Sequence, residues 1–382
     1  MFDFIIVGAG FAGSVLAERI ANKLNKKVLL IEKRNHLGGN CYDFRNEYGI
    51  IIHKYGPHLF HTNSKKVWDY LSNFTDWRYY NHKVLAFIDG KKVPIPFNLN
   101  SIEELFPKQL AEKLIDKLLL KYSYGKKVPI LKLLEDNDTD IKFLANFIYE
   151  KVFKNYTYKQ WGLDFSSLTQ EVTARVPVLI SRDDRYFQDK YQAVPLDGYT
   201  KIFERMLYHS NIKILLNTDF REFISIDLDS KKIFFLGKEF KGKLIFTGPI
   251  DQLFNYQFGF LPYRSLSFKF KTLNISFYQE VATVNYPNNY DFTRITEYKH
   301  IHPFDIDKTT VCIEYPKDYN PEKDIPYYPF FTKEAKELYL KYMELSKQFD
   351  NLILVGRLAE YKYYNMDSVI ERALNIFEEK IL

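Results

Sequence analysis

The chain opens with a strand, a glycine-rich turn and a helix in immediate succession, and this arrangement constrains the fold more than any other feature. Residues 4–7 (FIIV) form a short apolar run typical of a buried parallel strand, and Gly8, Gly10 and Gly13 follow in GxGxxG spacing. The first glycine permits the tight turn, the second lets the backbone approach a pyrophosphate, and the third lets the helix pack on the strand. Free N–H groups at the helix N-terminus favour the phosphates. The segment predicts a dinucleotide-binding βαβ unit.

The residues after the second strand indicate which dinucleotide binds. Residues 28–31 (VLLI) end at Glu32, at the distance expected for an acid that binds ribose hydroxyls. The glycine pair Gly38-Gly39 lies just beyond. This arrangement resembles the FAD-binding members of the glutathione reductase superfamily more than simple NAD dehydrogenases. We therefore expect FAD, held by Gly8, Gly10, Gly13, Glu32, Lys33, Gly39 and Asn40.

The rest of the chain predicts two further structural units, since 382 residues exceed the usual size of one core. Leu110, Leu114 and Leu118 recur at helical spacing, and residues 101–104 (SIEE) have the pattern of a capping box beginning at Ser101. Residues 260–315 alternate polar and apolar side chains, which is typical of an antiparallel sheet. We predict an α/β fold with a FAD-binding Rossmann-like domain of the glutathione-reductase type (1–65, 198–250 and 348–382), a helical insertion (98–165) and an antiparallel sheet or substrate domain (66–97, 166–197 and 251–347).

Composition and charge argue against several classes of protein. The net charge of +6 comes from lysines scattered among acids, which argues against nucleic-acid binding and suits a small anionic substrate. Cys41 and Cys312 are too few and too far apart for a disulfide framework, and no metal-binding Cys/His spacing occurs, so we expect no metal. No apolar stretch approaches the roughly 20 residues needed to cross a bilayer. With a strand so close to the first residue we expect no signal peptide, and hence a cytoplasmic protein.

Three segments carry residues suited to binding or chemistry. His58 and His61 follow the cofactor-binding unit, so histidines satisfied within a loop compete with histidines that reach the cofactor ring. Residues 156–162 (YTYKQWG) include one of three tryptophans, and a buried core explains them as well as a binding site does. Arg175 and Arg294 lie where the surrounding pattern predicts burial. A buried arginine needs an anion, and a pair of phosphates suits its planar donors.

Together these segments resemble the bacterial UDP-galactopyranose mutase family. The resemblance rests on residues 52–63 (IHKYGPHLFHTN), 156–162 (YTYKQWG), 247–252 (TGPIDQ) and 356–364 (GRLAEYKYY), and it runs from the first strand to the last helix. It implies a non-redox flavoenzyme that interconverts UDP-galactopyranose and UDP-galactofuranose through a covalent adduct between the sugar and N5 of reduced FAD. It also implies a homodimer whose furanose product supplies surface polysaccharide synthesis. Whether UDP-N-acetylgalactosamine is a further substrate stays open.

The resemblance also assigns roles to individual residues. It implies catalytic roles, including binding of the diphosphate by the two arginines, for Arg175, Arg294 and His61. It implies substrate contacts, from the uracil ring to the sugar, for Tyr156, Trp161, Arg175, Tyr186, Arg294, Tyr328, Tyr363 and Asn81. It adds His58, His61, Arg357 and Met366 to the cofactor-binding residues. Tyr327 adjoins Tyr328, so either tyrosine fits the assigned position.

One position departs from the family pattern. Asn365 stands where the family usually has an aspartate, which removes a negative charge near the flavin and the substrate, although Asp367 follows closely. An alternative class is a FAD-dependent oxidoreductase of the amine-oxidase type. That class predicts a second nucleotide site for NADPH, and the sequence has no second GxGxxG.

Overall fold

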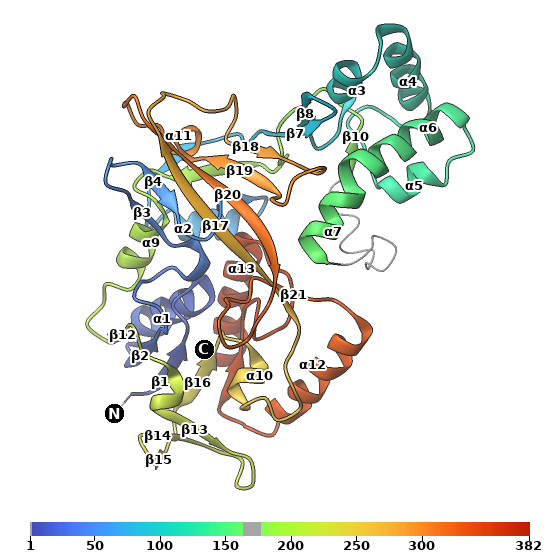
Figure 1. Cartoon of the computed structure of the whole chain (residues 1–382). Coiled ribbons are helices and arrows are strands. Elements are labelled where there is room, and N and C mark those ends of the chain that lie inside the picture. The colour runs from blue at the N-terminus through green and yellow to red at the C-terminus, as the bar shows by residue number, and fades with distance from the viewer. Residues whose placement is uncertain (1, 163–176) are drawn as a thin grey trace.

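The computed structural model describes residues 2–162 and 177–382, and it is built around a parallel sheet of five strands (Figure 1). Across this sheet the strands are β12 (Ile212–Leu215), β2 (Val28–Ile31), β1 (Phe4–Val7), β16 (Lys243–Phe246) and β22 (Leu352–Leu354). The apolar run at residues 4–7 is thus the middle strand, paired in parallel with β2 and β16. The Rossmann-like α/β prediction is confirmed.

Different layers cover the two faces of this sheet, because successive side chains of β1 point to opposite sides. Phe4 and Ile6 belong to one apolar core, and Ile5 and Val7 belong to another. The first core includes side chains of α1 (Phe11–Leu24), α2 (Lys65–Leu71), α9 (Tyr199–Met206) and α13 (Met366–Ile376). The second includes side chains of α10 (Ile250–Leu253), α12 (Lys333–Ser346), β13 (Ile224–Asp227) and β14 (Lys232–Phe235). The carboxyl ends of β1, β2 and β16 lie together at one edge of the sheet, because these strands are parallel.

A second sheet has seven strands and lies beside the unit that is built on the parallel sheet (Figure 1). Its order is β21 (Tyr328–Pro329), β17 (Tyr263–Leu273), β20 (Thr309–Asp318), β19 (Arg294–Glu297), β18 (Thr283–Asn285), β7 (Val84–Ile88) and β8 (Lys91–Ile95). All neighbours pair antiparallel except β18 and β7, which run parallel. The alternation seen over residues 260–315 therefore does correspond to antiparallel strands. Shorter strands beside it are β3 (Asp43–Arg45), β4 (Ile51–His53), β5 (Phe60–Thr62), β6 (Trp77–Tyr79) and β11 (Tyr191–Pro195).

Helices gather beyond β7 and β8, at one end of the seven-stranded sheet (Figure 1). They are α3 (Leu99–Leu105), α4 (Lys108–Lys121), α5 (Ile130–Leu134), α6 (Thr139–Ile148), the π-helical η2 (Tyr149–Lys154) and α7 (Asn155–Trp161). The predicted capping box at Ser101 is wrong. Asn98 caps α3 by accepting from the N–H groups of Asn100 and Ser101, and Ser101 is the third helical residue that completes the box. Asparagine caps as well as serine does, so the helix begins earlier.

Two further features complete the description. The last helix, α13, ends at Ile376 and the chain continues as the π-helical η5 (Phe377–Ile381). Among the described residues, no helix combines the length and hydropathy that a membrane span requires. The exact limits of the three predicted domains stay a prediction.

Candidate active site

A cavity of about 510 Å³ opens where β1, β2 and β16 end. Parallel α/β sheets bind ligands outside the carboxyl ends of their strands, so this is the expected place for a dinucleotide. Of the residues predicted to hold FAD, the cavity is lined by Gly8, Gly10, Glu32, Lys33, Gly39, Asn40, His58, Arg357 and Met366.

The three glycines of the GxGxxG motif have different structural roles. Gly8 has φ +103°, and a Cβ there would lie 2.1 Å from Thr247 Oγ1. A Cβ on Gly13 would lie 2.0 Å from the Gly8 carbonyl oxygen, so Gly13 lets α1 pack on β1 and lies outside the cavity lining. A Cβ on Gly10 would meet only Gly39 Cα, at 3.9 Å. The backbones of Gly10 and Gly39 lie side by side, since a Cβ on Gly39 would lie 3.1 Å from Gly10 Cα, and both glycines line the cavity. The bare backbone at Gly10 is therefore the place where a pyrophosphate can approach.

Polar groups beside this space fit a dinucleotide. Glu32 accepts hydrogen bonds from the Ala9 and Arg34 N–H groups, at 2.8 and 2.9 Å, which fixes its carboxylate at the end of β2. Arg34 Nη2 donates to Asn40 Oδ1 at 2.9 Å, whereas its buried Nη1 has no hydrogen-bond partner in residues 2–162 and 177–382. A buried guanidinium N–H without a partner suits an anionic ligand. The residues present therefore fit FAD.

A second cavity, of about 490 Å³, adjoins the first. The two share a wall made of Asn40, His58, Tyr327, Arg357, Asn365 and Met366. The second cavity also brings together most of the predicted substrate residues, namely Tyr156, Tyr186, Arg294, Tyr328 and Tyr363, together with His61. A ligand in the second cavity can therefore reach the end of a dinucleotide in the first.

Arg294 and Arg357 both line the second cavity, and of the two Arg294 lies away from the shared wall. Its Nη2 donates to the Tyr156 hydroxyl at 2.8 Å, and its Nε lies 3.4 Å from Glu314 Oε1 without a hydrogen bond. The Glu314 side chain is 5% exposed, and burial raises its pKa although Arg294 opposes this. Burial alone would lower the pKa of Arg294, but Glu314 together with Tyr156, Tyr328 and Tyr186 more than offsets this effect, and the pKa lies above its ordinary value. Arg294 therefore keeps its positive charge beside the open cavity.

Arg357 organises the aromatic end of the shared wall. Its guanidinium lies 5.6 Å from the ring centre of Tyr328 and 5.0 Å from that of Tyr363, and these two rings stack at 5.7 Å. It also donates to the Tyr327 and Tyr364 carbonyl oxygens, at 3.3 and 2.5 Å. Tyr327 and Tyr328 both line the second cavity, so both neighbours are available to a ligand.

The two histidines of the loop after the cofactor-binding unit have different surroundings. His58 borders both cavities, and its Nδ1 donates to the Gly56 carbonyl oxygen at 2.9 Å. Burial lowers the pKa of His58 to about 4, so its imidazole is neutral at pH 7. His61 lines only the second cavity, where it stacks on Phe187 at 3.6 Å and places Nδ1 at 2.8 Å from Asp189 Oδ2. The histidine beside the cofactor cavity is therefore His58.

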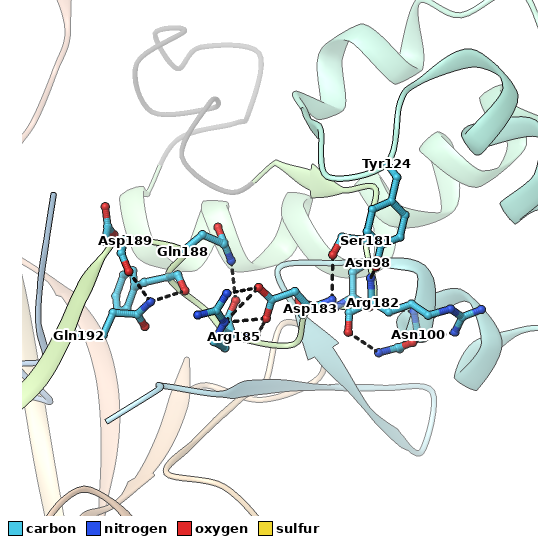
Figure 2. A network of polar contacts seen from close by, with 11 residues as sticks. Asn98, Asn100, Tyr124, Ser181, Arg182, Asp183, Arg185, Gln188, Asp189 and Gln192 are labelled. Atoms are coloured by element: carbon cyan, nitrogen blue, oxygen red, sulfur yellow. Dashed lines mark hydrogen bonds and ion pairs between the residues drawn. The ribbon is translucent and has the colours of Figure 1, made fainter. Parts of the chain in front are cut away.

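The segment that carries Tyr186 and Phe187 is held by a polar network (Figure 2). Asn98 donates to Asp184 Oδ1 at 2.9 Å and to the Asp183 carbonyl oxygen at 3.3 Å, which ties the segment to the start of α3. At the other end, Gln192 donates to the carbonyl oxygens of Phe187 and Asp189, at 3.0 and 2.9 Å. The network connects the helical unit to one wall of the second cavity.

Several predicted residues lie elsewhere. Asn81 is exposed and outside the lining of both cavities, whereas the next residue, His82, is buried and lines the second cavity. Alternating strand-like geometry sends adjacent side chains to opposite sides, so a shift of one residue decides which one enters. Arg175 lies outside the described residues, as does the side chain of Trp161.

Sequence reasoning missed other residues of the second cavity. These are chiefly polar side chains of the seven-stranded sheet and α7: Gln160, Thr283, Asn285 and Glu314. A charged Glu314 directly after the apolar residues 311–313 (VCI) of β20 was a usable signal. The others become visible only once β18, β19 and β20 are paired.

One cluster of the described residues could hold a metal ion: Asp43, His53 and His302 have ligand atoms within 4.8 Å of one another. Each already has a protein partner. The Asp43 carboxylate accepts from two N–H groups at the start of α9, at 2.6 and 2.8 Å, and His53 Nδ1 accepts from the His58 N–H at 3.0 Å. The two histidines share a hydrogen bond of 2.9 Å between their Nε2 atoms. These bonds account for the cluster without an ion.

Comparisons with known proteins agree with this site. A family model described as UDP-galactopyranose mutase matches residues 151–363, and one described as NAD(P)-binding Rossmann-like domain matches residues 6–74. The chain is 37% identical to UDP-galactopyranose mutase of Mycoplasma genitalium, over 97% of this chain and 92% of that protein. It is 33% identical to dTDP-fucopyranose mutase of Escherichia coli, over 98% of this chain and 97% of that protein.

The fold leads to the same group of proteins. A crystal structure of reduced UDP-galactopyranose mutase superimposes with a TM-score of 0.74 at 17% sequence identity, over 99% of this chain and 93% of that chain. At this identity the superposition shows a common fold, while the family model and the full-length relatives carry the assignment. On that evidence the chain belongs to the UDP-galactopyranose mutase family.

Proposed function

We propose that this chain is a flavin-dependent mutase that interconverts UDP-galactopyranose and UDP-galactofuranose. The observation that carries the proposal is the wall shared by the two cavities. His58, Arg357 and Met366 line both the cavity that fits FAD and the cavity that contains Arg294. A nucleotide sugar whose diphosphate lies on Arg294 can therefore place its sugar against the flavin. When bound and reduced, FAD supplies a nucleophilic N5 for the anomeric carbon of that sugar.

The residues of the second cavity would hold and neutralise the diphosphate. Arg294 keeps its charge and lies beside the cavity, so it stabilises the negative charge that develops as the bond between sugar and diphosphate breaks. Burial raises the pKa of Tyr186 and of Tyr328, so both hydroxyls keep their protons and can donate to phosphate oxygens. We propose that Tyr363, Trp161 and Arg175 contribute to the same ligand.

Two features keep the sugar end of the site suited to this chemistry. The neutral imidazole of His58 adds no positive charge next to the flavin, and Arg357 is fixed by two carbonyl oxygens and two rings. His61 is fixed by Asp189 and Phe187 and would position the sugar. A rigid wall on both sides of the reacting atoms holds them in the orientation that the rearrangement needs.

The finer features follow from the family. We propose that the protein works in the cytoplasm as a homodimer and that its furanose product supplies surface polysaccharide synthesis. The full-length similarity to a dTDP-fucopyranose mutase makes the nucleotide and the sugar a direct question for experiment. UDP-galactose, UDP-N-acetylgalactosamine and dTDP-fucose should be compared as substrates, and we expect the highest kcat/KM with UDP-galactose.

Incubation of the reduced enzyme with UDP-galactofuranose under anaerobic conditions tests the proposal. Chromatography should show many equivalents of UDP-galactopyranose per flavin without consumption of the reductant. The oxidised enzyme is the matched control and should be inactive. Loss of one equivalent of reductant per product would instead support an oxidoreductase of the amine-oxidase type.

A further inference from the structure

One face of the seven-stranded sheet forms the floor of the second cavity. The strand order shows which floor residues lie near the shared wall and which lie far from it. Tyr328 on β21 lies beside Arg357 at the shared wall, Glu314 is on β20, and Arg294 is on β19. One strand further lies β18, with Thr283. Neighbouring strands are about 4.8 Å apart. Residues on each successive strand from β21 to β18 therefore lie about 4.8 Å further from the proposed flavin site.

The register of the strands places Thr283 close to the paired residues Asn285, Arg294 and Glu314. Asn285 on β18 pairs with Arg294, which pairs with Glu314. Thr283 lies two residues from Asn285 on the same strand, so both side chains point to the same face. Thr283 and Asn285 both line the cavity. The cavity floor therefore extends along β18 from Asn285, which pairs with Arg294, to the hydroxyl-bearing Thr283.

That hydroxyl has no partner among residues 2–162 and 177–382. Thr283 is 2% exposed, and its Oγ1 makes no hydrogen bond to any of these residues. Asn285 and Gln160, which also line the cavity, each have a buried side-chain oxygen without a partner in these ranges, Oδ1 and Oε1 respectively. Buried polar groups in native proteins are nearly always hydrogen-bonded, so three such residues in the lining of one cavity indicate a ligand that completes their bonds.

We infer that Thr283 is a specificity-determining residue that hydrogen-bonds to an oxygen of the substrate's nucleoside. The inference rests on the proposed function: with the diphosphate on Arg294 and the sugar toward Arg357, the remaining part of the ligand is the nucleoside. That part lies over β18 and against Tyr156, where Thr283 Oγ1 is the buried hydroxyl. The nucleoside oxygen is either a carbonyl of the base or a hydroxyl of the ribose.

The chain provides a closely matched control in Thr296. Thr296 pairs with Thr283 across β18 and β19, is 1% exposed, and also has an Oγ1 without a partner in the described ranges. Thr296 is absent from the cavity lining. Replacing either threonine by valine keeps the shape and removes a buried hydroxyl, so the two variants differ mainly in whether that hydroxyl faces the ligand.

The test measures the Kd of UDP by calorimetry in the FAD-loaded enzyme. Thr283→Val should weaken UDP about three- to tenfold, the loss expected for one neutral hydrogen bond. Thr296→Val should leave the Kd within twofold of wild type, and Thr283→Ser should retain tight binding. Neither valine variant should lower the urea midpoint, because each removes an unsatisfied buried group. Equal UDP affinity in Thr283→Val and wild type, or equal losses in both valine variants, would overturn the inference.

A second ligand identifies the oxygen. If Thr283 contacts the ribose 2′-hydroxyl, 2′-deoxy-UDP should bind wild type more weakly, and Thr283→Val should weaken it no further. If Thr283 contacts a base carbonyl, the substitution should weaken UDP and 2′-deoxy-UDP by the same factor. Both results support the inference, and no effect with either ligand contradicts it. These measurements need no turnover, so a wild-type enzyme that binds UDP but fails to isomerise the sugar would count against the proposed function alone.

Discussion

The Lys159 ammonium of α7 lies 2.5 Å from the carbonyl oxygen of Tyr286, just past the end of β18. It also donates to the carbonyl oxygens of Tyr290 and Phe292, at 3.1 and 3.0 Å. One side chain therefore anchors the whole connection between β18 and β19, the strands that carry Asn285 and Arg294. This contact explains how a helix from the distant helical unit sets the geometry of the cavity floor.

Lys159→Met should loosen this connection and impair substrate binding. Hydrogen bonds from a charged group contribute about 1.5–3 kcal/mol, so we expect kcat/KM to fall by roughly tenfold or more, mostly through KM. Lys154→Met is the control, since Lys154 pairs with Glu150 on the exposed side of η2. Steady-state kinetics with both variants would refute the role of Lys159 if their KM values were the same.

Arg294 should be the most sensitive residue of the described cavity. Arg294→Ala removes a charged donor to the diphosphate, and about 1.5–3 kcal/mol corresponds to a loss in kcat/KM of tenfold to over a hundredfold. Arg294→Lys should restore little, because an ammonium cannot reproduce the planar fork of donors. Arg205→Ala, at an exposed arginine paired with Asp197, should behave like wild type. Wild-type kinetics in Arg294→Ala would remove this residue from the site.

Gly10 and Gly13 should separate cofactor binding from folding. A Cβ on Gly10 fits the protein but fills the space beside Gly39, so Gly10→Ala should fold and lose most of its FAD. A Cβ on Gly13 collides with the Gly8 carbonyl oxygen, so Gly13→Ala should lower the free energy of unfolding even without FAD. Flavin absorbance per protein and urea unfolding of the FAD-free proteins measure the two effects. Full FAD content in Gly10→Ala would contradict the assignment of the pyrophosphate.

Asn365→Asp should be tolerated. Asn365 is the N-cap of α13 and makes no capping hydrogen bond with its side chain, although it borders both cavities. An aspartate at this position favours the helix N-terminus by about 0.3–1 kcal/mol and brings a negative charge toward the flavin. We expect an intact, FAD-containing protein whose flavin has a more negative reduction potential. A flavin-free or unfolded variant would show that the local structure requires the amide.

Stability should fall in mild acid because burial lowers the pKa of five histidines, one of which is His58, with a pKa of about 4. Burial lowers the pKa of His36 to about 4, that of His82 and of His302 to about 3, and that of His53 well below its ordinary value. As the pH falls below about 6.5, the unfolded chain takes up protons that the folded chain cannot, so the free energy of unfolding decreases. Each histidine contributes up to about 1.4 kcal/mol per pH unit.

Asp251, Asp43 and Glu314 act in the opposite direction, since burial raises the pKa of each, that of Asp251 to about 6, but these carboxyls are fewer than the histidines. Urea unfolding at pH 7.5, 6.5 and 5.5 should show the decrease, and His302→Gln should reduce its slope. A free energy of unfolding that stays constant across this range would contradict the prediction.

Elements encoded by local sequence patterns were predictable, whereas contacts between distant segments were not. The βαβ unit was predictable because the glycines, the apolar strands and Glu32 are all close in sequence and obey local rules. The helix start at Ser101 was misplaced because asparagine and serine compete as caps, and only the backbone shows that Asn98 is chosen.

Residues of the cavity floor show the limit most clearly. Thr283, Arg294 and Glu314 become neighbours through strand pairing between distant segments, which no local pattern encodes. Arg294 stood out as a charged residue in a segment whose pattern predicts burial, whereas Thr283 is an ordinary residue for a strand. Only its burial and its unpartnered hydroxyl distinguish it.

The wall common to the two cavities has a thermodynamic consequence. Because His58, Arg357 and Met366 line both cavities, occupation of one cavity limits the rearrangements open to the other. We expect FAD and the nucleotide sugar to tighten each other's binding, and the two factors must then be equal. On that expectation, a cell rich in nucleotide sugar protects this protein against loss of its flavin, and starvation for that sugar lets the flavin escape.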